Sequence, residues 1–174
     1  MDILIQILIA TIPAAIVFLT TAVFLKRQGE KDARRMQMQL NRTKKKQNFL
    51  TERMEAYQRA ILLLERIHPN SLIMRIHNPA LPSAVFQTEL IKAVREEFEH
   101  NVTQQLFISI EAWNMLKKAK DETAKIINVA GQQMSDTSMS TDLAGKIFEI
   151  VGEVGDLPTE IAVEYLKKEF QELF

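Results

Sequence analysis

Apolar residues follow one another at intervals of three or four through most of the chain, which is the period of an amphipathic helix. No alternating pattern of the kind that marks a strand runs for more than four residues. The predicted fold class is therefore all-α: an N-terminal transmembrane helix, a basic helical stalk and a small helical bundle. The bundle helices are expected near residues 50–68, 83–106, 109–130, 143–154 and 158–174, with a proline-rich connector at 69–82.

The most apolar stretch is residues 3–25, which contain no charged side chain. These 23 residues would span roughly 34 Å as a helix, against a hydrocarbon core of roughly 30 Å. A cleaved signal peptide is the alternative, but it needs a basic start, and only Asp2 precedes the run. The pattern predicts a transmembrane anchor at residues 1–25.

A basic segment follows this run and dominates the charge pattern. Residues 26–46 hold nine basic and two acidic side chains, a net +7, whereas residues 47–174 carry −6. The excess of positive charge predicts a bacterial inner-membrane protein with its N-terminus outside and its body cytoplasmic. It also predicts contact with anionic lipid headgroups. The side chains predicted to lie at the membrane surface are Lys26, Arg27, Lys31, Arg34, Arg35, Arg42, Lys44, Lys45 and Lys46. Nucleic-acid binding is not expected, because no aromatic residues interleave with them.

The predicted stalk, residues 26–49, lies between the anchor and a cytoplasmic helical domain predicted at residues 50–174. A heptad spacing crosses this boundary through Met36, Leu40, Thr43, Gln47, Leu50, Met54, Tyr57, Ile61 and Leu64. It is compatible with a weak coiled coil between two or more chains, interrupted by the polar Thr43 and Gln47. The preferred interpretation is a solvated spacer that becomes a bundle helix after Leu50, because a coiled coil requires sustained heptads.

Candidate chemistry is sparse. The chain has no cysteine, which excludes disulfides, thiolate metal sites and cysteine nucleophiles. Two Glu-x-x-His sequences are present, Glu65 with His68 and Glu97 with His100. Residues three apart share a helix face, and di-iron four-helix proteins bind metal through two such pairs. Because the core-facing positions of these helices look apolar, we predict no metal, no cofactor and no catalytic residue.

Five short sequences carry a resemblance to a known family. They are Ile-Pro-Ala at residues 12–14, Glu-Ala-Tyr-x-Arg at 55–59, Leu-Leu-Glu-Arg-Ile at 63–67, Arg-Glu-Glu-Phe-Glu-His-Asn at 95–101 and Glu-Ala-Trp at 111–113. The chain resembles an uncharacterised family of single-pass membrane proteins from Bacteroidota, with a helical cytoplasmic domain of unknown function. The resemblance implies an inner-membrane location and brings no activity or cofactor.

Two functional hypotheses follow. The first is a membrane-anchored, non-enzymatic scaffold or interaction protein, whose helical domain binds an unknown protein partner or forms a homo-oligomer through the stalk. The alternative is a metal-dependent, di-iron-like enzyme that uses the two Glu-x-x-His pairs.

Overall fold

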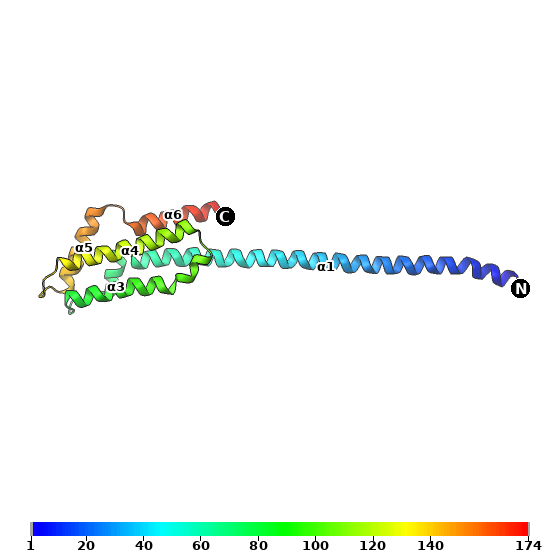
Figure 1. Cartoon of the computed structure of the whole chain (residues 1–174), viewed down its shortest axis with the longest axis horizontal. Helices are drawn as coiled ribbons and strands as arrows, with labels where there is room; N and C mark the ends of the chain where they lie inside the picture. Colours follow the sequence, from blue (N-terminus) through cyan, green and yellow to red (C-terminus); the bar gives the residue numbers. More distant parts are fainter. Residues whose placement is uncertain (1, 174) are drawn as a thin grey trace. The chain divides into compact units, whose positions relative to one another are not determined.

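The computed structural model of the chain is built from α-helices (Figure 1). It describes the backbone of residues 2–173 and the side chains of residues 16–173. The helices are α1 (Asp2–Ile67), α2 (Pro69–Ile76), α3 (Ser83–His100), α4 (Ile110–Gln132), α5 (Ser140–Val154) and α6 (Pro158–Leu173), with a 3₁₀ turn, η1 (Val102–Leu106). The all-α part of the predicted fold class is confirmed.

The chain falls into two compact units, Met1–Leu50 and Thr51–Phe174. The first unit is the N-terminal part of α1. Every position from 16 to 50 is exposed to solvent within this single chain. The second unit contains the rest of α1 and all the other helices, and the hydrophobic core lies within it.

The prediction of a transmembrane anchor is wrong, because no helix among the described residues is long and apolar enough to cross a membrane. The predicted inner-membrane location, and the orientation drawn from it, fall with the anchor. Residues 1–15 of the predicted span lie outside the described side chains.

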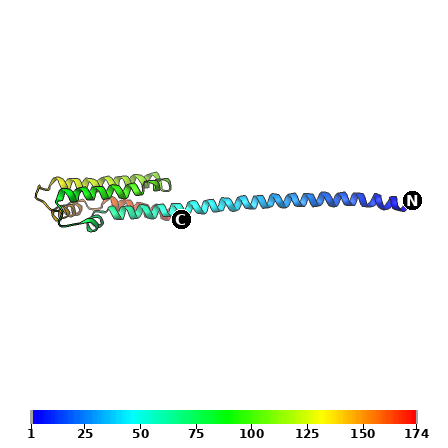
Figure 2. The ribbon, with the colours of Figure 1, turned by 90° about the horizontal axis from the view of Figure 1, so that it is seen from below.

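The body is a bundle of long helices. In both views α3 and α4 run side by side, and α4 also packs against α5 and α6 (Figures 1 and 2). The last turns of α1 also contribute to the core. Their apolar face, which begins at Ala56, is buried. The largest fully buried side chains are Tyr57, Leu63, Leu64, Ile67, Leu72, Phe86, Leu90, Leu116, Ile127, Leu143, Ile147 and Leu166.

Two loops at one end of the bundle are joined by backbone hydrogen bonds. The N–H of Ser83 donates to the carbonyl of Ser138 (2.9 Å), and the N–H of Ser140 donates to the carbonyl of Leu81 (2.9 Å). The buried Ser140 hydroxyl donates to the carbonyl of Asn78 (2.7 Å). These bonds fix the start of α5 against the connector that follows α2.

Candidate functional site

Glu97, from the second Glu-x-x-His sequence, is held by two arginines. Arg66 Nε lies 2.6 Å from Glu97 Oε1, and Arg75 Nη1 lies 3.6 Å from the same oxygen. Arg75 also donates from Nη2 to the carbonyl of Arg66 (3.3 Å). The Glu97 side chain is only 15 % exposed. The carboxylate thus joins α1, α2 and α3 as an ion-pair centre.

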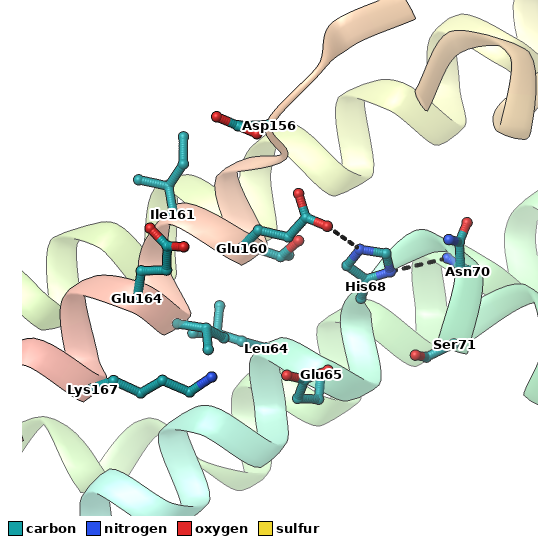
Figure 3. A pocket seen from close by; sticks show the side chains of 12 residues that line it. Leu64, Glu65, His68, Asn70, Ser71, Asp156, Glu160, Ile161, Glu164 and Lys167 are labelled. Carbon is teal, nitrogen blue, oxygen red and sulfur yellow. Dashed lines mark hydrogen bonds and ion pairs between the residues drawn. The ribbon is translucent and has the colours of Figure 1, made fainter. Parts of the chain in front are cut away.

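His68, from the first sequence, is hydrogen-bonded through both ring nitrogens (Figure 3). As the residue before Pro69 it is the N-cap of α2, and its Nδ1 accepts from the N–H of Asn70 (3.3 Å). Its Nε2 lies 3.4 Å from Glu160 Oε1 on α6. His68 therefore caps one helix and contacts the first turn of another.

The remaining members of the two pairs do not complete a ligand set. Glu65 lies one turn before His68 at the edge of a pocket, and His100 is exposed at the last position of α3. Within the described residues, no group of three or more His, Cys, Asp or Glu side chains is placed to hold a metal ion. Glu97 and His68 lie instead in separate contacts, one with arginines and one with a glutamate.

The pocket beside His68 has a volume of about 640 Å³ and is formed by the end of α1, the start of α2 and the start of α6 (Figure 3). Glu160 accepts from the N–H of Leu157 through Oε2 (3.0 Å), and this bond lowers the pKa of Glu160, with a further contribution from His68. His68 and Glu160 thus both cap helix N-termini, His68 at α2 and Glu160 at α6. We interpret this pocket as a junction between helix ends, because the His68 imidazole and the Glu160 carboxylate already accept hydrogen bonds from backbone N–H groups at those ends.

A polar network that the sequence did not reveal links three helices of the body. The Tyr57 hydroxyl donates to Glu169 Oε1 (2.8 Å), and the Ser109 hydroxyl donates to Glu169 Oε2 (2.9 Å). Ser109 is the N-cap of α4 and accepts from the N–H of Ala112 (3.0 Å). The Tyr57 pKa is raised to about 12, first by burial and then by the hydrogen bond to Glu169. Tyr57 looked like an ordinary core aromatic in the sequence, and only its phenol oxygen distinguishes it.

The exposed stripe of α1 lies in the unit of residues 1–50. We use this name for Met36, Leu40, Thr43 and Leu50, which share a heptad register. Met36 is 65 % exposed, Leu40 53 % and Leu50 44 %. The nine basic side chains of residues 26–46 are exposed as well. Their predicted contact with anionic headgroups stays a prediction.

Further along α1, side chains at the d positions of the same heptad are buried and not exposed. Tyr57 and Leu64, which continue the heptad, are buried in the core of the body. Tyr57 packs edge-on against Phe170 of α6, with ring centroids 5.5 Å apart. The body therefore covers the d positions of the second half, whereas Met54 at an a position is 38 % exposed and Ile61 is half-buried; in the first half the apolar positions face solvent.

Comparison with known proteins gives one positive result. The model of a family of unknown function, DUF7935, matches residues 2–173. No curated protein and no solved structure matches the chain. The predicted resemblance is confirmed as far as an uncharacterised family is concerned, and the assignment to Bacteroidota stays a prediction. Because the match covers nearly the whole chain, this protein belongs to the DUF7935 family.

Proposed function

We propose that this protein is a non-enzymatic interaction protein. The exposed stripe of α1 binds another helix. The observation that carries the proposal is the exposure of Met36, Leu40 and Leu50 on one register of a long helix. Most of the stability of a protein helix comes from packing an apolar face against a partner. Met36, Leu40 and Leu50 are exposed, so their side of the helix has no such packing within this chain.

The state of the acidic and histidine side chains supports a non-enzymatic role. Glu97 is neutralised by Arg66, and His68 and Glu160 are used at helix ends. A general base or metal ligand must be able to reach a substrate or an ion with its own lone pair. Glu97, His68 and Glu160 instead direct these lone pairs to other residues of the same chain.

Site-specific photo-crosslinking in living cells tests the proposal. A photoreactive amino acid is placed at Leu40 of the full chain, with Lys45 on the opposite side of the helix as the matched control. We expect a discrete covalent adduct from position 40 and a much weaker one from position 45. Equal labelling at the two positions, or no adduct at either, would contradict the proposal.

A further inference from the structure

We infer that the helix bound to the exposed stripe of α1 is the same segment of a second copy of this chain, aligned parallel and in register. The inference rests on the proposed function and names its partner. It follows from how apolar, polar and charged side chains are distributed around the heptad of residues 32–51. Each class of side chain gives a separate argument for the same arrangement.

The first argument comes from the a and d positions of the heptad, which form the seam between two coiled helices. Met36, Thr43 and Leu50 occupy the d positions of the heptad, and Leu40 and Gln47 occupy the a positions. Thr43 already donates its hydroxyl to the carbonyl of Gln39 (3.0 Å), so it can enter a seam without an unsatisfied donor. In register, each Gln47 faces its own copy. An amide carries both donors and acceptors, so two facing amides are complementary.

The charged side chains next to the seam favour the parallel direction. In a parallel pair each g position faces the e position five residues later on the partner. Lys44 at e then faces Gln39, and Lys46 at g faces Thr51. No lysine at these flanking positions therefore meets a lysine of the second copy.

An antiparallel pair has the opposite outcome. Stacking Leu40 on Leu50 of the second copy brings e beside e and g beside g, so that Lys44 meets Lys44 and Lys46 meets Lys46. Like charges across a helix interface select against an arrangement, because e and g residues set partner choice and orientation. The apolar contacts are available in both directions, and the lysines separate the two.

Of the other seven basic side chains in residues 26–46, Lys26 falls at an a position, before the heptads of residues 32–51. The remaining six point away from the seam, at b, c and f positions: Arg27, Lys31, Arg34, Arg35, Arg42 and Lys45. They oppose association only through long-range repulsion between two segments of net +7. Because salt screens such repulsion, association must strengthen as ionic strength rises, whereas binding to an acidic partner would weaken.

Disulfide cross-linking of the full chain tests the inference, since the native chain has no cysteine. The variants are Leu40→Cys and Leu50→Cys on the stripe and Lys45→Cys on the outer side as the matched control. Disulfides require Cα atoms about 4.4–6.8 Å apart, a distance that only facing positions reach. We expect each stripe variant alone to form a covalent dimer at least tenfold faster than the control variant. Circular dichroism of each reduced variant checks that its helix content is unchanged.

Mixing the two stripe variants distinguishes the directions. A dimer that forms between Leu40→Cys and Leu50→Cys chains, but in neither variant alone, would show the antiparallel arrangement and overturn the inference. Sedimentation between about 0.01 M and 1 M salt, over which the screening length falls from about 30 Å to about 3 Å, should show the dimer fraction rising. A falling fraction would also overturn it.

Failure of this inference and failure of the proposed function give different results. A photo-adduct at position 40 whose mass is this chain plus a different protein, without a disulfide dimer, retains an interaction role and rejects the second copy. A photo-adduct with twice the mass of the chain, together with a disulfide dimer, supports both.

Discussion

Removing one buried hydroxyl, in Tyr57→Phe, provides a quantitative test of the body. Tyr57 is 1 % exposed, and its hydroxyl donates to the Glu169 carboxylate at 2.8 Å. Phenylalanine retains the ring and its edge-on contact with Phe170, so the change isolates the hydrogen bond. Glu169 keeps its second bond, from the Ser109 hydroxyl.

The expected magnitude follows from the partners. A hydrogen bond to a charged group contributes about 1.5–3 kcal/mol to stability, and the half-buried Glu169 favours the lower end of this range. We therefore expect Tyr57→Phe to lower the free energy of unfolding by about 1.5 kcal/mol near pH 7.

This difference must depend on pH in one direction. An unfolded tyrosine loses its proton near pH 10.0, whereas folded Tyr57 has a pKa of about 12. Between these values the unfolded state binds fewer protons, so the native chain loses up to about 1.4 kcal/mol of stability per pH unit. The contribution is complete below pH 10.0 and is lost as the pH rises toward 12. The phenylalanine variant lacks this term, so the gap of about 1.5 kcal/mol should close about one pH unit above 10.0 and reverse at higher pH.

Urea unfolding followed by the fluorescence of Trp113 measures both effects. Trp113 is the single tryptophan of the chain and is 8 % exposed, so its emission reports the core of the body. The matched control is Tyr165→Phe, a half-buried tyrosine of α6, for which we expect a smaller loss near pH 7. If the Tyr57→Phe difference stays constant from pH 7 to pH 11, the hydroxyl is not held as described.

Three further substitutions, two of them with a matched control variant, are measured by the same urea titration. Gly155 has φ 77° and ψ −128°, so Gly155→Ala should cost about 1–3 kcal/mol, whereas Gly152→Ala, with open space around its Cβ, should gain up to about 1 kcal/mol. Glu97→Gln should cost about 1 kcal/mol, because its arginines are 44 % and 37 % exposed, and Glu96→Gln should be near neutral. Ser140→Ala should cost about 1 kcal/mol by removing the hydrogen bond from a buried hydroxyl to the carbonyl of Asn78, which keeps the N–H of Leu81 as a donor.

The helices themselves were largely predictable, because their apolar periodicity is regular. Phe86, Leu90 and Val94 repeat every four residues, and all three are buried on α3. The same repeat continues to Val102 and Leu106, yet these are 40 % and 75 % exposed. The helix ends at His100, where no proline or glycine marks the end. A stop set by tertiary packing is invisible to a local pattern.

The candidate site was predictable only as far as spacing allows. Three-residue spacing correctly placed Glu97 and His100 in one helix. Whether such a glutamate meets a metal or an arginine depends on which helix packs beside it. Arg66 and Arg75 come from two other helices, and neither stands at a spacing that identifies it as a partner. The Tyr57–Glu169 bond was missed for the same reason.

The two halves of the heptad run show what periodicity can and cannot determine. A single register defines one continuous face from Met36 to Leu64, because helical geometry places those residues together wherever the helix extends. What covers the face depends on the rest of the molecule: α6 reaches Tyr57, and the apolar residues Met36, Leu40 and Leu50 remain exposed. An apolar face of the same register needs the same kind of cover in both halves. In the second half the chain covers Tyr57 and Leu64 with its own body. For the first half we propose an identical helix from a second copy, because that helix has the matching register and a parallel pair keeps the flanking lysines apart.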